Sequence, residues 1–332
     1  MTFPVHRSGE RTPYARGEAF GRAQAPLIAN TLALYRRMFR ETNGTNAAAA
    51  GRSVALSAAE QEEIAGIAHG AGQDEYELRA INARTEILAG ASGLTECSVV
   101  GQGGLLAQNW DWHPDASQCT LVWIVEHEDG WFATLTEAGI LAKIGLNDAG
   151  LGVCLNILHT TADGGLDGTP IHILLRRTLA TAKTVDDALE ILTAATTTAS
   201  SAVTVATPND VASVELSPGG ANVIRGPVGA HTNHFLQPPR RGRDTVPTDS
   251  PSTIPRLEVV RTQPLLDALR DHSSRPKSVC RHADPGEPWV DQTATVASVV
   301  MNLAARRLHV AAGPPCTHEH VQIAMPALTS SG

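Results

Sequence analysis

Residues 97–112, CSVVGQGGLLAQNWDW, decide the fold of this chain, because the spacing of apolar residues changes there from helical to strand-like. The run from Cys97 to Val100 is followed by a Gly101-Gln102-Gly103-Gly104 turn and a second apolar run, so the stretch predicts a β-hairpin. The hairpin presents the Cys97 thiol at the edge of a sheet and the Asp111 carboxylate one strand away. If the chain cleaved itself before Cys97, this residue would carry both a nucleophile and a base.

The residues before this hairpin are predicted to be mainly helical. Apolar residues recur there at helical spacing, and Ser or Asp followed three residues later by Glu marks helix starts. The expected helices cover about 15–41, Ser57 to near Gly70 or Gly72, and Asp74 to Gly90, with a loose connector at 42–53.

The residues after the hairpin are predicted to form mainly strands joined as consecutive hairpins. Strands are expected at about 119–126, 131–137, 140–146, 151–157, 201–206, 211–216, 221–225, 295–301 and 306–312. Helices are expected at about 169–182, 185–195 and 264–271, and an exposed loop at 237–255. Strands in hairpins, with helices grouped before and between them, predict an α+β layered sandwich with largely antiparallel sheets.

Composition and charge restrict the classes of function. The 332 residues are 42% hydrophobic and 18% charged, which is typical of a globular protein. A net charge of −8 without a long basic run argues against a nucleic-acid partner. Five cysteines lie scattered without a CxxC pair, so we expect reduced thiols and a cytoplasmic protein. We expect no membrane span, because the longest apolar stretch, near 121–125, is far too short.

A series of short motifs along most of the chain is specific in its order and spacing. The motifs are RGEAFG at 16–21, NARTE at 82–86, ECS at 96–98, QNWD at 108–111, KIGLN at 143–147, GLG at 150–152, HTNH at 231–234 and AAGPPC at 311–316. Together they resemble the acyl-coenzyme A:isopenicillin N acyltransferase (penicillin acyltransferase) family of cysteine N-terminal-nucleophile hydrolases.

The resemblance implies that the chain cleaves itself between Glu96 and Cys97. It implies a helical α chain, 1–96, and a β chain, 97–332, that stay associated in one four-layer αββα sandwich. Glu96 and Ser98 stand where the family often has Gly and Thr, so the cleaved bond here carries an additional charged side chain.

The resemblance and the residue chemistry together assign catalytic roles. Cys97 is the expected nucleophile, forming an acyl-thioester, and Asp111 is expected to orient its α-amine. Asn233 matches the position expected to donate to the oxyanion, and an amide suits this role because it carries donors without a charge. Purely structural roles also stay open: Asp111 as a turn or capping residue, and Asn233 as a residue that orders a loop.

Two further residues are expected to contact the substrate. They are Trp110, which at its strand position fits the core equally well, and His231. Arg84 is expected to tie the helices to the junction before Cys97.

We expect a small-molecule amide or thioester substrate and no cofactor, with coenzyme A only as a co-substrate. Cys280 with His282, and Cys316 with His318-Glu319-His320, suggest zinc ligands, but their spacing matches no regular zinc pattern, so no metal is predicted. The sequence leaves open whether the acyl group passes to water or to an amine. Two other functions also stay open: an uncleaved binding module of the same fold, and an intact cysteine hydrolase that uses His231 or His234 as base.

Overall fold

Two β-sheets form the centre of the computed structural model, which describes residues 2–89 and 97–327. The eight-stranded sheet consists, in spatial order, of β1 (Val5–Ser8), β4 (Thr120–His127), β5 (Gly130–Glu137), β6 (Ile144–Asn147), β7 (Gly152–Ile157), β8 (Ser201–Ala206), β9 (Val211–Ser217) and β10 (Gly220–Arg225). The six-stranded sheet consists of β11 (Gly229–His231), β2 (Ser98–Gln102), β3 (Leu105–Trp112), β12 (Ala294–Asn302), β13 (Arg307–Ala311) and β14 (Val321–Gln322). Neighbouring strands are antiparallel, except that β1 runs parallel to β4.

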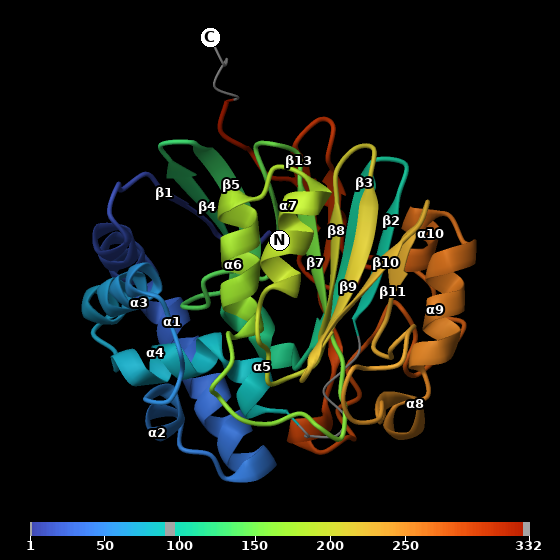
Figure 1. The fold of residues 1–332 in the computed structure, drawn as a ribbon, viewed down its shortest axis with the longest axis horizontal. Coiled ribbons are helices and arrows are strands. Elements are labelled where there is room, and N and C mark those ends of the chain that lie inside the picture. The colour runs from blue at the N-terminus through green and yellow to red at the C-terminus, as the bar shows by residue number, and fades with distance from the viewer. Residues whose placement is uncertain (1, 90–96, 328–332) are drawn as a thin grey trace.

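The two sheets pack face to face, with β2 and β3 against β7 and β8. Helices α6 (Ile171–Thr181) and α7 (Val185–Thr193) cover the outer face of the eight-stranded sheet, as Figure 1 shows. Helices α9 (Thr253–Thr262) and α10 (Leu265–Leu269) cover the outer face of the six-stranded sheet. The predicted four-layer αββα sandwich is therefore confirmed. Central strands such as β8 and β9 are buried along their whole length because both of their faces are covered.

The N-terminal helices form a separate group beside the β1 edge of the eight-stranded sheet (Figure 1). They are α1 (Pro13–Asn43), α2 (Ala47–Gly51), α3 (Ala58–Ala71), α4 (Glu75–Asn82) and α5 (Arg84–Ile87). Helices α1 and α3 approach closely at glycines: a Cβ atom at Gly17 would lie 2.1 Å from the Glu63 carbonyl oxygen, and one at Gly66 would lie 2.2 Å from the Tyr14 carbonyl oxygen. Only glycine permits this distance, which explains why Gly17 stands in the RGEAFG motif.

Several predicted element boundaries are wrong. The helix expected from Asp74 to Gly90 is broken at Ala83, whose ψ of 24° is not helical, and Gly90 lies outside the described residues. The strand expected at 140–146 begins only at Ile144, the first residue of β6, because residues 138–143 form a turn and an irregular segment. The connector at 42–53 contains α2, which Asn46 caps. Sequence patterning also missed the short parallel strand β1.

The predicted loop at 237–255 contains a short helix, α8 (Val246–Asp249), and the start of α9. Its prolines suggested irregular structure. However, Pro247 and Pro255 both fall in the first turn of a helix, where proline is tolerated because the first backbone N–H groups have no partner within the helix.

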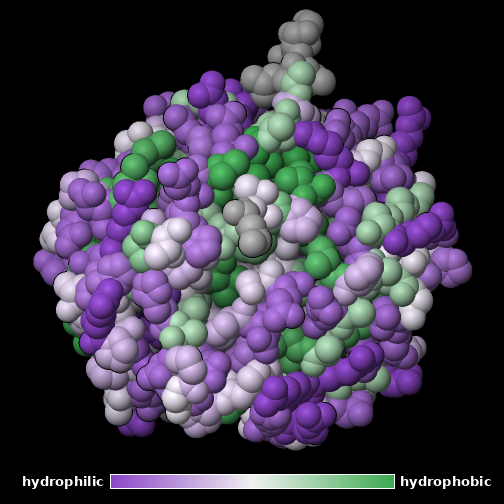
Figure 2. Space-filling view, turned by 180° about the vertical axis from the view of Figure 1, so that it is seen from behind, coloured by the Kyte–Doolittle hydropathy of each residue, from purple (hydrophilic) through white to green (hydrophobic). Residues whose placement is uncertain are grey.

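Figure 2 shows the face opposite to that of Figure 1, where hydrophilic residues predominate and hydrophobic side chains gather towards the upper centre. Within residues 2–89 and 97–327, no helix has both the length and the apolar character that crossing a membrane requires.

Candidate active site

Cys97 lies immediately before β2 and is buried, with 6% of its surface exposed. Strand β2 pairs with β3 through a turn in which Gly103 and Gly104 have φ of 60° and 76°, which confirms the predicted hairpin. The register places Ser98 opposite Asn109, and the Cys97 Sγ atom lies 3.7 Å from the Asp111 carbonyl oxygen. The two residues that the sequence pairs are therefore neighbours.

The Cys97 carbonyl oxygen accepts two hydrogen bonds from buried side chains. The donors are Asn156 Nδ2 on β7 and Arg256 Nη1 on α9, both at 2.9 Å. Arg256 also donates to Ser98 Oγ at 2.9 Å and, through Nη2, to Asn233 Oδ1 at 3.0 Å. One buried guanidinium thus connects Cys97 to Asn233, which follows β11 and whose Nδ2 donates to the Ile157 carbonyl oxygen at 3.0 Å.

Asp111 is buried and fixed from the neighbouring strand. Its Oδ1 atom accepts a hydrogen bond of 2.7 Å from Thr295, which lies directly opposite it on β12. Burial, with the negative charge of Asp111, raises the pKa of the Cys97 thiol to about 11. In the intact chain the thiol is therefore protonated at neutral pH and needs a nearby base to become a nucleophile.

Trp110 is buried beneath a cluster of charged residues. The Lys143 Nζ atom lies 3.6 Å from the centre of the Trp110 ring and forms an ion pair with Glu137. Tyr35 donates a hydrogen bond of 2.6 Å to Glu137 Oε1, and Arg84 Nε lies 3.8 Å from the same atom. This environment is that of a core residue, and the role of Trp110 in substrate binding stays a prediction.

Arg84 is itself buried, and its guanidinium lies 4.3 Å from the centre of the Trp112 ring. It therefore links α5 to β3 and β5. Residues 90–96, to which it was expected to connect, lie outside the described part of the chain.

Replacing Glu137 with Gln, in a Cys97→Ala background, is expected to lower the free energy of unfolding by about 3 kcal/mol or more. The change leaves Lys143 and Arg84 buried without their carboxylate. Burial alone would raise the pKa of Glu137, but the charges of Lys143 and Arg84 outweigh it and lower the pKa to about 2. The stabilisation is thus present above pH 4.5 and is lost as the pH falls towards 2, so the variant should show less acid sensitivity in that range.

Urea denaturation at pH 7 and at pH 3 measures this effect. The control is Glu41→Gln, which removes a surface carboxylate 2.7 Å from Arg37 Nε and should cost less than about 1 kcal/mol. Equal losses in the two variants would contradict the importance of the buried cluster.

His231 occupies an interior position on β11, opposite Val99 of β2. Its Nε2 atom lies 3.0 Å from Glu215 Oε1, and its Nδ1 atom lies 2.7 Å from the Thr232 carbonyl oxygen. Both ring nitrogens are therefore engaged within the protein, and contact with a substrate stays a prediction.

His234 is a weak candidate for a catalytic base. Burial, together with the nearby His231 and Arg256 charges, lowers its pKa to about 4, and its Nδ1 atom lies 2.9 Å from Thr253 Oγ1. Among the described residues, neither His231 nor His234 forms a hydrogen bond with the Cys97 thiol. The geometry gives little support to an intact-chain thiol–histidine pair.

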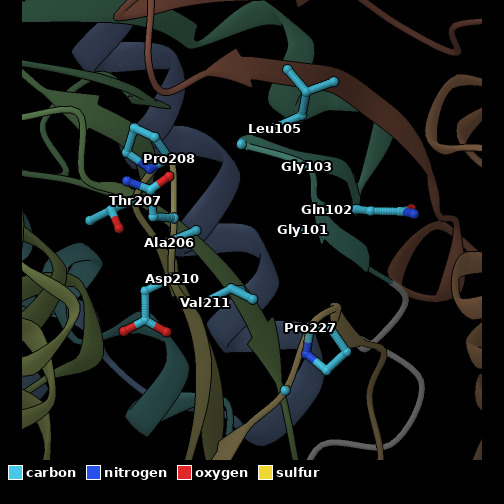
Figure 3. Close-up of a pocket in the computed structure, with 13 residues that line it drawn as sticks. Gly101, Gln102, Gly103, Leu105, Ala206, Thr207, Pro208, Asp210, Val211 and Pro227 are labelled. Atoms are coloured by element: carbon cyan, nitrogen blue, oxygen red, sulfur yellow. The ribbon is translucent and has the colours of Figure 1, made fainter.

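The glycine turn of the hairpin lines a pocket of about 240 Å³ (Figure 3). The other walls come from residues 206–211, between and within β8 and β9, and from 226–227. Cys97 lies about 13 Å away, because four residues of extended strand at about 3.3 Å each separate it from Gly101. The turn joins two strands and does not open a helix, so it lacks the strand–loop–helix context of a dinucleotide-binding loop.

Sequence reasoning missed Asn156 and Arg256, which hold the Cys97 carbonyl oxygen, and Lys143, whose charge acts on the Cys97 thiol. Lys143 stands in the quoted KIGLN motif, so a signal existed, but its contact with Trp110 depends on the pairing of β5 with β6. Arg256 had no signal, since it lies next to the predicted loop and is buried only because α9 packs on β2.

Comparison with known proteins agrees with the motifs. The sequence model of a family described as acyl-coenzyme A:6-aminopenicillanic acid acyl-transferase matches residues 99–316. The 40 kDa form of acyl-coenzyme A:6-aminopenicillanic-acid-acyltransferase from Emericella nidulans is 30% identical in an alignment of length 278 that covers 76% of this chain and 75% of that protein.

Two solved structures are also similar. Penicillin V acylase from Agrobacterium tumefaciens aligns with a TM-score of 0.47 at 15% identity, over 69% of this chain and 86% of that one. A mutant conjugated bile acid hydrolase from Clostridium perfringens aligns with a TM-score of 0.44 at 13% identity, over 70% and 93%. The sequence matches confirm the family resemblance: the chain belongs to the acyl-coenzyme A:6-aminopenicillanic acid acyl-transferase family of enzymes.

Proposed function

We propose that the chain cleaves itself between Glu96 and Cys97, and that the new N-terminal Cys97 then hydrolyses or transfers an acyl group at an amide bond. One observation supports this above all. Cys97 immediately precedes β2, with its thiol against the Asp111 end of β3 and its carbonyl oxygen held by Asn156 and Arg256. Glu96 lies outside the described residues.

Cleavage starts with attack of the Cys97 sulfur on the Glu96 carbonyl carbon. The C–N bond breaks, the nitrogen takes up the thiol proton, and a thioester replaces the amide. Water then hydrolyses the thioester, which restores the thiol and leaves Glu96 with a new carboxylate.

Catalysis uses the freed α-amine as base. An ordinary α-amine has a pKa near 8, so it can accept the proton of the Cys97 thiol at neutral pH, whereas the intact chain has no amine there. The thiolate attacks the substrate carbonyl carbon, and the protonated α-amine gives its proton to the leaving amine of the substrate. An acyl-thioester on Cys97 remains. Water or a second amine then attacks this thioester, and the α-amine again accepts the proton.

Asp111 and Asn233 stabilise the two charges that develop during the reaction, one on the α-amine and one on the oxyanion. Asp111, fixed by Thr295, stabilises the protonated α-amine next to it. The Asn233 amide, held by Arg256 and Ile157, donates to the oxyanion of the tetrahedral intermediate. In both cases a hydrogen-bond partner fixes the side chain before reaction, so little reorganisation is needed.

The two chains produced by cleavage stay associated in this proposal. Residues 1–96 contribute β1 to the eight-stranded sheet. Tyr35 of this chain donates a hydrogen bond to Glu137 of the other chain. The carboxylate of Glu63 accepts hydrogen bonds of 2.7 and 2.9 Å from Arg176 on α6, and both side chains are buried. Separating the chains would expose these charges and the apolar faces around them.

We take the substrate to be a small-molecule amide or thioester. The names of the family and of the relative from Emericella nidulans mention an acyl-coenzyme A donor and 6-aminopenicillanic acid, so these two compounds are the first probes. Coenzyme A enters as a co-substrate only, and no cofactor is required by the steps above. Five cysteines without a disulfide fit a cytoplasmic site of action.

Intact mass under denaturing conditions tests the proposal. The wild type should give two chains of about 10 and 25 kDa, in proportion to the lengths of 1–96 and 97–332 within 35.0 kDa. Brief incubation with an acyl-coenzyme A thioester should add the acyl mass to the larger chain, and 6-aminopenicillanic acid should remove it faster than water if transfer operates. A single 35.0 kDa chain would exclude the N-terminal nucleophile and favour the uncleaved module or the thiol–histidine hydrolase.

A further inference from the structure

Four side chains of the kinds that bind zinc converge beside the six-stranded sheet, one of them buried, one half-buried and two exposed. They are His272, Cys280, His282 and Cys316, and one ligand atom from each lies within 4.8 Å of all the others. His272 and His282 face each other with Nε2 atoms 3.2 Å apart, and Cys316 Sγ lies 3.3 Å from His282 Nε2. We propose that these four residues bind one zinc ion.

The distances fit a tetrahedral site. Zinc lies about 2.0–2.1 Å from histidine nitrogens and about 2.3 Å from thiolate sulfurs, so tetrahedral ligands are separated by roughly 3.3–3.8 Å. The separations of 3.2 Å between the two histidine nitrogens and 3.3 Å between Cys316 Sγ and His282 Nε2 are close to the lower end of this range. A small inward movement of the remaining atoms, which lie within 4.8 Å, completes the set.

The donor set selects the metal and its role. Two thiolates and two neutral imidazoles balance the charge of Zn²⁺, and this mixture of sulfur and nitrogen suits zinc better than magnesium or calcium. Four protein ligands leave no position for water or substrate, so the site is structural, not catalytic.

Only the fold brings these residues together, which is why their spacing along the chain shows no zinc pattern. His272, Cys280 and His282 stand on the segment between α10 and β12, whereas Cys316 follows β13. The segments already touch, since Arg270 Nε donates to the Pro315 carbonyl oxygen at 3.3 Å. The other histidines near Cys316 lie elsewhere: His320 Nε2 is 3.0 Å from Ser298 Oγ, and His318 Nδ1 is 3.2 Å from the Pro314 carbonyl oxygen.

The zinc ion would clamp the segment that supports Asp111. Arg281, between two of the ligands, donates its backbone N–H to Thr295 Oγ1 at 2.9 Å, and Thr295 in turn donates to Asp111 Oδ1. Asn109 Nδ2 holds the same segment by donating to the Leu269 and Val279 carbonyl oxygens at 2.8 and 2.9 Å. The ion thus adds a cross-link to a segment that is tied to the strand bearing Asp111.

Metal content tests the proposal independently of enzyme activity. Protein expressed with added zinc and then dialysed against metal-free buffer containing a phosphine reductant should retain about one zinc ion per chain by mass spectrometry. In the Cys280→Ser/Cys316→Ser double variant the content should fall at least tenfold. The matched control is His318→Gln, a histidine two residues from Cys316 and outside the cluster, which should keep the metal.

Cobalt gives a second readout that reports the ligands themselves. Co²⁺ added to zinc-free protein should produce thiolate charge-transfer bands in the near ultraviolet and tetrahedral bands in the visible. The single variants His272→Gln and His282→Gln retain both thiols, so they test the site even if the double variant does not fold. Zinc below one-tenth of an ion per wild-type chain, or cobalt spectra without thiolate bands, would overturn the proposal, as would a mass 2 Da low from a Cys280–Cys316 disulfide.

Discussion

The Cys97→Ala variant is expected to remain a single chain of 35.0 kDa and to lose turnover by a factor of at least about 10⁴. The residue supplies the sulfur for both cleavage and acyl transfer, and after cleavage it also supplies the amine that serves as base. Removing the thiol therefore removes the first step of each reaction, and no other side chain replaces it. The measurements are intact mass and the rate of acyl release from an amide or thioester probe.

Cys154→Ala is the matched control for this variant. Cys154 is another fully buried thiol, on β7 near Cys97, but it carries no role in the proposed reaction. It should still give two chains and should retain turnover, at a modest cost in stability from the lost sulfur. Cleavage of Cys97→Ala into the same two chains would instead show that another protease produces them.

The Cys97→Ser variant separates the roles of thiol and amine. A hydroxyl is a weaker nucleophile than a thiol at neutral pH, so cleavage should slow from minutes to hours or stop. If this variant is cleaved slowly but has no detectable turnover, self-cleavage and catalysis share a nucleophile but differ in how strongly they need the thiol.

The parts of the fold that sequence could predict are those controlled by local chemistry. The hairpin from Cys97 to Trp112 depends on alternation and on two glycines with positive φ, both visible in the sequence. The predicted capping box at Ser57 sets a helix start through hydrogen bonds that span three residues, and the structure confirms it. Thr184 and Asp187 form a second box of the same kind at the start of α7.

The wrong predictions occur where distant contacts decide the local conformation. The helix expected to reach Gly90 breaks at Ala83, next to Asn82, whose side chain bonds the Gly139 carbonyl oxygen and the Leu141 N–H of a distant turn. Within the candidate site, Cys97, Asp111 and Asn233 followed from motifs, but Arg256, which joins Cys97 to Asn233, lies 159 residues after Cys97 in the chain. The proposed zinc ligands could not be predicted for the same reason, because Cys316 comes close to the other three residues only when β12 and β13 pair.

Asn233→Leu is expected to lower kcat by about 10²–10³ while KM changes little, as for removal of one donor from an oxyanion hole. Leucine has the same number and branching of side-chain heavy atoms as asparagine but is bulkier, so the change removes the amide donors without opening a cavity. The effect should fall on kcat because the oxyanion exists only in the transition state and the intermediate, whereas the bound substrate has a neutral carbonyl.

The same substitution also disturbs structure, and the design must separate the two effects. Asn233 Oδ1 accepts from Arg256 and its Nδ2 donates to Ile157, so its loss should cost about 1–3 kcal/mol of unfolding free energy. Asn222→Leu is the matched control, because it also removes a buried amide, whose Nδ2 donates to the Pro238 carbonyl oxygen at 2.9 Å. Asn222 lies on β10, the last strand of the eight-stranded sheet, whereas Cys97 precedes β2 of the six-stranded sheet. This control should lose comparable stability but less than a factor of three in kcat.

If Asn233→Leu behaves like Asn222→Leu, with kcat within tenfold of the wild type, then Asn233 orders the segment after β11 and the oxyanion donor lies elsewhere. If only Asn233→Leu loses kcat strongly while both variants lose similar stability, the Asn233 amide must donate to the oxyanion that forms during acyl transfer.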